Sequence, residues 1–394
     1  MDIEGKGAFG NMTNGADEKI YRVLALDGGG MRGLYTARLL ETLAQRFNKR
    51  FSGDIHPDIG AAFDLICGTS TGSILACALA AGIPLAKVRE IYTKNGAEIF
   101  PKPMPRAQDT GKVRNFGVPP FLKWIWEHRS MAAGNAQKLH DLLFNLLGSE
   151  TLDDVFKRRG IALCVPTINA VNHHPVVLKT GHNPGKHRDD KYRLVDVCLA
   201  SSSAPIILPI HRMEDPNDKD AWQFFVDGGL WANNPILIAL VEALQVTRGK
   251  QPIEIISAGT CSSPTGDPAA VQNPNWGILN WKAGIGIVEM SMSAQAAGYS
   301  FTAGLLAQSL NACGLSIRVV RLPERGRSPE QCTALGLDRA NTVAIQTLLE
   351  LAKGDADSIH SDALKGGDEG LKVVADIFSS LSEHTPQTQE VKNV

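Results

Sequence analysis

The sequence predicts an α/β fold in which helices pack against a mostly parallel central sheet. Two observations support this prediction. Short apolar segments of strand length alternate along the chain with longer segments of helical periodicity, the pattern of a layered α/β protein. The strand-like segments are also almost wholly apolar, as expected of buried strands in a parallel sheet. No internal repeat interrupts the alternation.

The N-terminal elements follow a polar, glycine-rich segment, residues 1–20, that we expect to be a flexible tail. Leucines at helical spacing and short apolar runs then define the elements in order. They are a strand at 21–26, a helix reaching residue 47, a strand at 61–67, and helices at about 72–82 and 84–99.

Residues 101–137 are rich in proline, basic and aromatic residues, which predicts a long irregular insertion with one short helix. Loops of this length are uncommon unless they are functional or disordered. Aromatic side chains with basic neighbours suit a membrane headgroup layer, so the insertion is a candidate interfacial flap, with a packed surface helix as the alternative. The residues concerned are Phe116, Phe121, Trp124, Ile125 and Trp126, beside Lys112, Arg114 and Lys123. Residues 273–284 are a second candidate.

The remaining elements continue the alternation of strands and helices. We expect strands at 161–169, 175–179, 222–226, 253–259 and 317–322, a Ser/Ala turn at 200–205, and helices at about 235–247, 285–310 and 338–352. From residue 354 the chain turns polar, which predicts a C-terminal extension, 354–394, with one amphipathic stretch near 370–381.

Composition excludes several classes of protein. The 394 residues carry a formal net charge of −1, so no global basic field would attract a nucleic-acid polymer. Apolar runs are shorter than the roughly 20 residues that span a bilayer, and the N-terminus lacks the apolar core of a secretory signal. The seven cysteines are scattered, with no CxxC pair. We therefore expect a cytoplasmic protein with reduced thiols.

The motif Gly68-Thr69-Ser70-Thr71-Gly72 follows an expected strand and opens an expected helix. A serine on such a sharp strand–turn–helix junction exposes its hydroxyl, and the flanking glycines, Gly68 and Gly72, permit the tight turn. Ser70 is therefore the candidate nucleophile, with a simple helix cap as the alternative.

A serine nucleophile needs a base, and the sequence offers two kinds. Downstream of residue 211 the only histidines are His360 and His384, both in the polar C-terminal part, so a Ser–His–Asp triad lacks a well-placed member. Asp227 instead follows the apolar strand 222–226, where the ligand crevice of an α/β sheet is usually found. A partly desolvated carboxylate there would be a reasonable base.

The glycine-rich segment Asp27–Gly33 supports two interpretations. Gly28, Gly30 and Gly33 spell a dinucleotide fingerprint, but the acid about 20 residues on, Asp54, does not end a strand. Alternatively, consecutive glycines before a helix direct backbone N–H groups at one point and form an oxyanion hole. Arg32 would then orient the loop or bind a lipid phosphate.

Four motifs together resemble the patatin-like phospholipase family: DGGGMRG (27–33), GTSTG (68–72), ASSSAP (200–205) and DGGLWANNP (227–235). They match over about 21–240, and the hydrolase domain is expected over 21–353. The resemblance implies a three-layer α/β/α hydrolase that cleaves acyl esters of phospholipids without a metal. It implies a Ser70–Asp227 dyad and an oxyanion hole at Gly28, Gly29 and Gly30, with Arg32 at the family's basic position.

Within that family the opening LALDGGGMRGLYTARLLE, the compact length and the added C-terminal helices resemble bacterial effectors of cyclic-oligonucleotide antiphage signalling. That resemblance implies a cyclic dinucleotide activator, no other cofactor, and a phospholipid membrane surface as substrate, attacked at its inner face. A homo-oligomer is left open. The alternatives are an ungated lipase or esterase of lipid metabolism, a Ser–His–Asp esterase on small esters, and a nucleotide-binding module without hydrolysis.

Overall fold

The computed structural model describes residues 19–51, 55–105, 120–216, 218–261, 275, 281 and 285–385. Most of the expected N-terminal tail (1–20), Asp54, and residues 112, 114 and 116 of the expected flap lie outside these ranges. So does most of 273–284, the second candidate membrane segment.

The described strands form one mixed sheet in the order β5-β6-β3-β2-β1-β7-β8, with β4 paired to β3. The central pairs β3/β2, β2/β1, β1/β7 and β7/β8 are parallel, and the pairs made by β4, β5 and β6 are antiparallel. The expected α/β fold with a mostly parallel sheet is confirmed. The strands are β1 (Tyr21–Leu26), β2 (Leu65–Gly68), β3 (Ala162–Asn169), β4 (Pro175–Lys179), β5 (His211–Asp215), β6 (Asp218–Asp227), β7 (Ile253–Ala258) and β8 (Ile317–Arg321).

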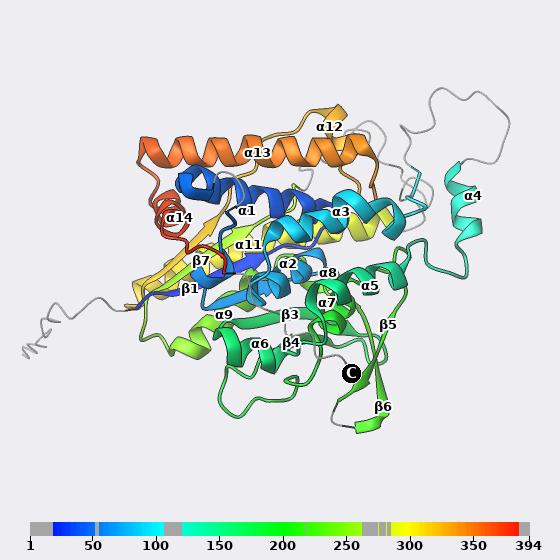
Figure 1. Ribbon diagram of the computed structural model, residues 1–394, viewed down its shortest axis with the longest axis horizontal. Coiled ribbons are helices and arrows are strands. Elements are labelled where there is room, and N and C mark those ends of the chain that lie inside the picture. Colours follow the sequence, from blue (N-terminus) through cyan, green and yellow to red (C-terminus); the bar gives the residue numbers. More distant parts are fainter. Residues whose placement is uncertain are drawn as a thin grey trace, which may run out of the picture.

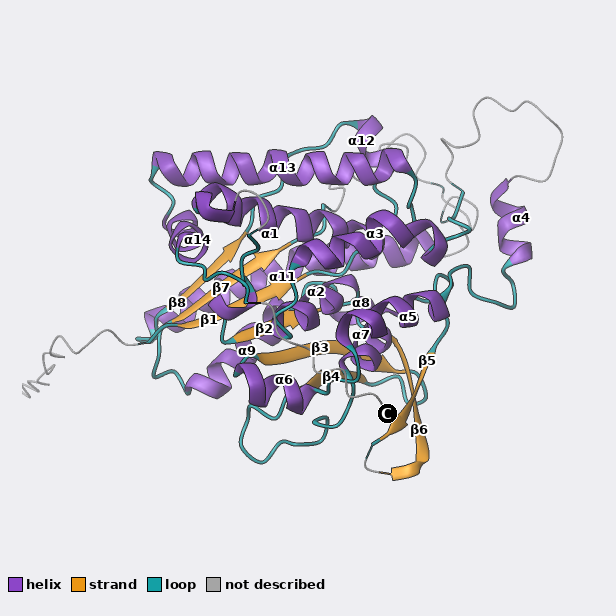
Figure 2. Ribbon diagram, in the orientation of Figure 1, coloured by secondary structure: helices purple, strands orange, loops and turns teal. Residues whose placement is uncertain are grey.

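Helices cover both faces of this sheet, and Figures 1 and 2 show the strands running between them. The helices are α1 (Gly33–Phe47), α2 (Thr71–Ala80), α3 (Leu85–Ile99), α4 (Pro120–Glu127), α5 (Ala136–Leu147), α6 (Leu152–Arg159), α7 (Leu194–Ser202), α8 (Gly229–Ala232), α9 (Ile236–Thr247), α11 (Ile285–Ala312), α12 (Pro329–Ala334), α13 (Thr342–Lys365) and α14 (Glu369–Ser379). Short 3-10 helices lie at Gly30–Arg32, Lys49–Phe51 and Gly60–Ala62.

Strand β1 separates two hydrophobic cores because its side chains alternate between the faces of the sheet. Leu24 and Leu26 join the larger core, which includes α1, α2, α3, α7 and α13. Val23 and Ala25 join a second core with α9 and α11. This two-sided burial explains why the strand reads as a continuous apolar run.

The C-terminal boundary expected at residue 354 needs correction, because α13 runs through it from Thr342 to Lys365. Helix α14 then packs against α1, α13 and β8. Its buried apolar side chains, including Ile377 and Phe378, belong to the larger core. The polar residues that suggested an extension occupy the outer face of an amphipathic helix, so residues up to 385 are part of the domain.

Two other expectations also change. The Ser/Ala segment 200–205 is only partly a turn, since α7 continues to Ser202. In the expected flap, the Trp124 side chain is buried and its indole Nε1 donates to the Lys102 carbonyl oxygen at 3.1 Å, whereas Trp126 is exposed. Among the described helices, none is long and apolar enough to cross a lipid bilayer.

Candidate active site

Ser70 occupies the turn between β2 and α2. Its backbone has φ 52° and ψ −123°, a left-handed conformation that costs energy for a residue with a Cβ. The Ser70 N–H donates to Ser201 Oγ at 2.8 Å, and Ser201 Oγ donates in turn to the Pro166 carbonyl oxygen at 2.6 Å. The strained turn is thus held in place from the end of α7, as strained residues at functional sites usually are.

The two glycines of the motif allow the turn to pack closely. A Cβ at Gly68 would lie 2.2 Å from the Gly72 carbonyl oxygen, and a Cβ at Gly72 would lie 2.3 Å from the Leu26 carbonyl oxygen. Both contacts are to backbone atoms that cannot move aside cheaply. The motif therefore needs glycine at both positions to bring β1, β2 and α2 together.

Asp227 lies at the end of β6 and faces Ser70. The Ser70 hydroxyl donates to Asp227 Oδ2 at 2.7 Å, and the Gly229 N–H donates to Oδ1 at 2.6 Å. The main chain is fixed as well, because the Asp227 N–H donates to the Ser203 carbonyl oxygen at 3.0 Å. Two separate elements, α2 and β6, therefore meet in one hydrogen-bonded Ser–Asp pair.

The Asp227 carboxyl is buried, with 3% of its surface exposed. Burial raises its pKa from the ordinary 3.8 to about 6, while hydrogen bonds from Ser70 and from the Gly229 N–H oppose the rise. Desolvation disfavours the charged carboxylate, and this makes Asp227 a stronger base than a solvated aspartate. The group remains ionised at neutral pH.

The glycine loop after β1 lies beside this pair. Gly29 and Gly30 line the cavity at Ser70, and Gly30 has φ +55°, which favours glycine. Within the described part of the chain, no hydrogen bond uses the Gly29 or Gly30 N–H. These two donors are therefore free to meet an oxyanion.

Gly28 and Arg32, which we expected at the oxyanion hole, make other contacts in the structure. The Gly28 N–H already donates to the Asn233 carbonyl oxygen at 2.9 Å, so it is not available to substrate. The Arg32 Nε donates to the Gly29 carbonyl oxygen at 3.4 Å, and its side chain is not part of the cavity wall. Arg32 therefore contacts the glycine loop outside the cavity.

A partly buried ion pair fixes the start of the same loop. Asp27 accepts two hydrogen bonds from the Arg321 guanidinium, at 2.8 and 2.6 Å, and Arg321 also donates to Ser257 Oγ. The pair joins the ends of β1 and β8 across β7. Such fork-to-fork contacts fix geometry as well as charge.

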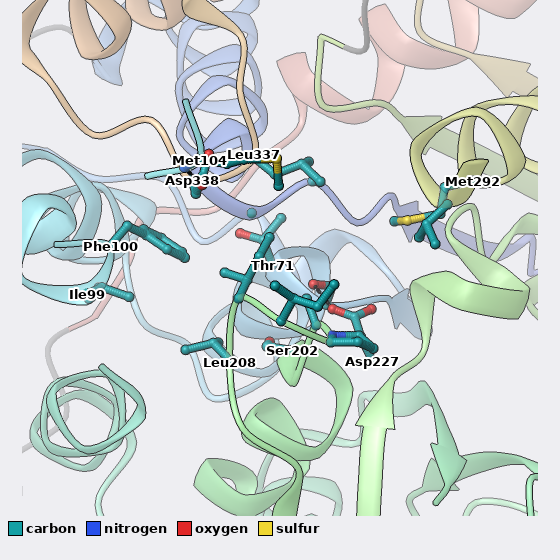
Figure 3. Close-up of a pocket in the computed structure, with 18 of the residues that line it drawn as sticks. Thr71, Ile99, Phe100, Met104, Ser202, Leu208, Asp227, Met292, Leu337 and Asp338 are labelled. Carbon is teal, nitrogen blue, oxygen red and sulfur yellow. Dashed lines mark hydrogen bonds between the residues drawn. The ribbon is translucent and has the colours of Figure 1, made fainter. Parts of the chain in front are cut away.

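The dyad opens into a cavity whose walls are mostly apolar (Figure 3). Met292 lies near Asp227, and Ile99 and Phe100 lie at the other end of the cavity in that view. Its apolar lining includes Ile74, Ile99, Phe100, Leu139, Leu208 and Met292. A hydrocarbon chain bound to such walls would be favoured by burial of its methylene groups.

None of the ten histidines, all of which lie in described segments, lines this cavity. The two that the triad interpretation required are elsewhere. The His360 ring stacks edge-on against Phe47 with centroids 4.9 Å apart, and the His384 N–H donates to the His56 carbonyl oxygen. The geometry supports Asp227 as the partner of Ser70.

Sequence reasoning missed Ser201 and Ser202 as site residues. Ser201 holds the Ser70 N–H, and Ser202 lines the cavity beside Asp227 (Figure 3). Ser202 Oγ is buried and has no hydrogen-bond partner among the described residues. The motif ASSSAP marked this region, but nothing in it indicated which serine faces the nucleophile.

Comparisons with known proteins identify related sequences. A model of the patatin-like phospholipase family matches residues 24–240, more than half of the chain. A cGAMP-activated phospholipase of Vibrio cholerae is 30% identical over 283 residues, covering 69% of this chain and 74% of the relative. One of Escherichia coli is 29% identical, covering 72% and 74%. Human GIVD cytosolic phospholipase A2 aligns with a TM-score of 0.42 and 12% identity, over 91% of this chain and 60% of that chain.

Proposed function

We propose that this chain, which belongs to the patatin-like phospholipase family, hydrolyses fatty-acyl esters of membrane phospholipids through a Ser70–Asp227 dyad. The observation that carries the proposal is the 2.7 Å hydrogen bond from Ser70 Oγ to Asp227 Oδ2 at the wall of an apolar cavity. The apolar walls of the cavity suit an acyl chain, and the hydrogen-bonded Ser70–Asp227 pair suits nucleophilic attack on the ester carbonyl of that chain.

In the first half of the reaction, Asp227 Oδ2 accepts the Ser70 proton as Ser70 Oγ bonds to the ester carbonyl carbon. The resulting oxyanion accepts hydrogen bonds from the Gly29 and Gly30 N–H groups, donors of a kind worth about 3 kcal/mol each in the transition state. The tetrahedral intermediate collapses when the C–O bond to the glycerol oxygen breaks. That oxygen takes the proton from Asp227, and lysophospholipid leaves.

In the second half, water attacks the acyl-Ser70 ester. Asp227 takes a proton from the water as its oxygen bonds to the acyl carbon, and the same N–H groups hold the second oxyanion. When the acyl C–Oγ bond breaks, Ser70 Oγ recovers the proton from Asp227 and the fatty acid is released. The carboxylate therefore acts as base and acid in turn, a role that its raised pKa supports.

Fatty-acid release from phospholipid vesicles tests this assignment. Ser70→Ala and Asp227→Asn should each lower the rate by at least about 1000-fold, because each removes one half of the proton relay. Ser203→Ala is the matched control and should retain activity, because Ser203 follows α7 and its hydroxyl donates to the Leu199 carbonyl oxygen. An Asp227→Asn enzyme close to the wild-type rate would exclude the dyad.

We further propose that a cyclic dinucleotide activates the enzyme in antiphage defence, and that it acts on the inner face of the membrane. Support comes from the names of the V. cholerae and E. coli relatives, both cGAMP-activated phospholipases. The test compares vesicle hydrolysis with no nucleotide, with cGAMP and with other cyclic dinucleotides. Equal rates in every arm would favour an ungated lipase of lipid metabolism.

A further inference from the structure

The segment after α7 forms one wall of the active-site cavity and also reaches solvent. Residues 204–208 line the cavity, and Leu208 is buried there. In contrast, Ile206 and Ile210 are 46% and 56% exposed. The same short apolar segment therefore runs from the cavity wall to the protein surface, with Ile206 at the cavity mouth and Ile210 four residues further along the chain.

Ile206 is held at this mouth in a strained conformation. Its φ is +75°, in the left-handed region that β-branched residues rarely adopt. Two backbone hydrogen bonds hold the segment: the Ala133 N–H donates to the Ile206 carbonyl oxygen at 3.0 Å, and the Gly134 N–H donates to that of Ile207 at 2.7 Å. Strain of this kind persists only where the surroundings enforce it, and it clusters at functional sites.

The start of helix α11 supplies another part of the cavity wall. Val288 and Met292 face the cavity, one helical turn apart. In the same turns, Ile287 and Met290 lie on the face of the helix turned away from these two residues, and each is 53% exposed. The sequence of α11 contains a single charged residue, Glu289, although much of the helix is exposed. A surface helix normally carries charged residues on its outer face, so this face is unusual.

A third group of exposed side chains, Trp126 and Met131, precedes Ala133 in the chain. Met131 is 66% exposed, two residues before Ala133, whose N–H bonds the Ile206 carbonyl oxygen. Trp126 is 67% exposed, and the Arg129 guanidinium lies 4.0 Å from its ring centroid. An indole with a stacked cation suits the boundary between lipid headgroups and acyl chains.

We propose that these side chains form a membrane-docking rim, defined as Trp126, Met131, Ile206, Ile210, Ile287 and Met290. Single exposed apolar residues are ordinary on any protein, but here they lie on three chain segments, and two of these, the segment after α7 and the start of α11, also line one apolar cavity. The occupant is the acyl-chain boundary of a phospholipid surface. An acyl chain that leaves the bilayer through this rim would reach Ser70 without exposing its methylene groups to water, which is unfavourable.

This inference rests on the proposed lipase function, so the experiment separates binding from turnover. Binding is measured in a Ser70→Ala background, which leaves the vesicles intact, by sedimentation with vesicles of phosphatidylethanolamine and phosphatidylglycerol. Each variant is tested with and without cGAMP. The rim variants are Ile210→Asp, Ile287→Asp and Met290→Asp, none of which changes a residue that lines the cavity.

The matched control is Leu364→Asp. Leu364 is 72% exposed near the C-terminal end of α13, at the opposite end of the molecule from α4 in Figure 1. Met290→Leu, which keeps an apolar side chain, is a second control for folding and for helix propensity. Thermal unfolding of every variant checks that the substitution leaves the fold intact.

We expect each rim Asp variant to bind vesicles about tenfold more weakly, while Leu364→Asp and Met290→Leu bind as the parent does. In enzyme that retains Ser70, the rim variants should still hydrolyse a soluble short-chain ester but should lose hydrolysis of vesicle phospholipids. Unchanged vesicle binding in the rim variants overturns the rim and leaves the lipase function standing. Rim-dependent binding without ester hydrolysis in any arm overturns the lipase function instead.

The alternative occupant is a second copy of this chain, because the exposed apolar face of α11 continues to Phe301 and Leu305. Light scattering of the parent and of Ile287→Asp distinguishes the two. A rim variant that changes the molar mass of the protein, with no change in vesicle binding, would assign the surface to self-association and overturn the proposal.

Discussion

At the scale of single residues, the pair Ser70 and Asp227 makes the pH dependence of the reaction predictable. Asp227 must be ionised to accept the Ser70 proton, and burial raises its pKa to about 6. We therefore expect kcat/KM on a soluble ester to rise with pH and to level off above an apparent pKa near 6. An acid limb close to the ordinary aspartate value of 3.8 would mean that the carboxyl is solvated in the working enzyme.

The same raised pKa predicts how Asp227 affects stability. A carboxyl whose pKa is higher in the folded state binds its proton more tightly there, so folding is favoured below the unfolded pKa of 3.8. That contribution, about 3 kcal/mol for a shift of this size, is lost as pH rises through 6. Asp227→Asn, which carries no charge, should therefore be more stable than the wild type at about pH 8 and similar at about pH 4. Urea unfolding at the two pH values measures the difference, and an equal difference at both would refute the desolvation argument.

Ser202 provides a further prediction at this scale, because its buried Oγ has no partner among the described residues and faces the cavity. A buried hydroxyl without a partner typically costs about 1–3 kcal/mol of stability, and at the cavity wall it could donate to a bound substrate or to water. Ser202→Ala should therefore raise the unfolding temperature and lower kcat about tenfold, through loss of a hydrogen bond to substrate or attacking water. A Ser202→Ala enzyme with unchanged kcat would make the hydroxyl a packing defect only.

At the scale of elements, the structure brings Asp227 to Ser70 in a partly different way from the one that the sequence suggested. We expected a strand that ends at the crevice of a parallel sheet, but β6 is antiparallel to β3. It pairs with β3 over only Phe225–Asp227, opposite the last residues of β3. Strand β6 therefore runs toward the carboxyl end of β3 from beyond the sheet edge and ends at Asp227. Strand direction depends on long-range pairing, which local apolar patterning does not encode.

Loop geometry was the least predictable part of the site. The glycines after β1 indicated an oxyanion hole, but the Gly28 N–H is taken by the carbonyl of Asn233, a residue remote in sequence. Only the folded arrangement reveals which N–H groups remain free. In contrast, the GTSTG turn was predictable because its strand, its glycines and its helix are consecutive in the chain.

The pair Asp27–Arg321 makes the dependence of this loop on β8 testable. Arg321→Met leaves the buried Asp27 carboxylate without its counterion, which typically costs about 3–5 kcal/mol, and it frees the start of the glycine loop. Replacing both residues, Asp27→Asn with Arg321→Met, removes the uncompensated charge. We expect the double variant to recover most of the stability measured by urea unfolding but not kcat. Recovery of both would show that the ion pair does not position the loop.

At the scale of the whole molecule, the sequence suggested a hydrolase domain ending at 353 and a separate polar extension. In the structure, apolar side chains of both segments belong to the same hydrophobic core. The amphipathic stretch near 370–381 was visible, but only the fold shows that its apolar face is covered by α1 and α13. An apolar stripe indicates that a helix packs against something. It does not indicate whether the partner is the same domain.

This difference can be decided by truncation. Helix α14 buries Leu371, Val373, Val374, Ile377 and Phe378 in the larger core. Burial of each side chain contributes about 1.5–3 kcal/mol, so their sum is comparable to the 5–15 kcal/mol by which a typical domain is stable. A chain that stops after residue 366 should therefore be insoluble or lack cooperative unfolding, whereas one that stops after 385 keeps every described residue and should melt as the full chain does. A soluble, active chain ending at 366 would restore the independent extension that the polar sequence suggested. Phe378→Ala offers a milder version of the test, since a loss of about 3–5 kcal/mol is expected only if α14 is part of the hydrolase core.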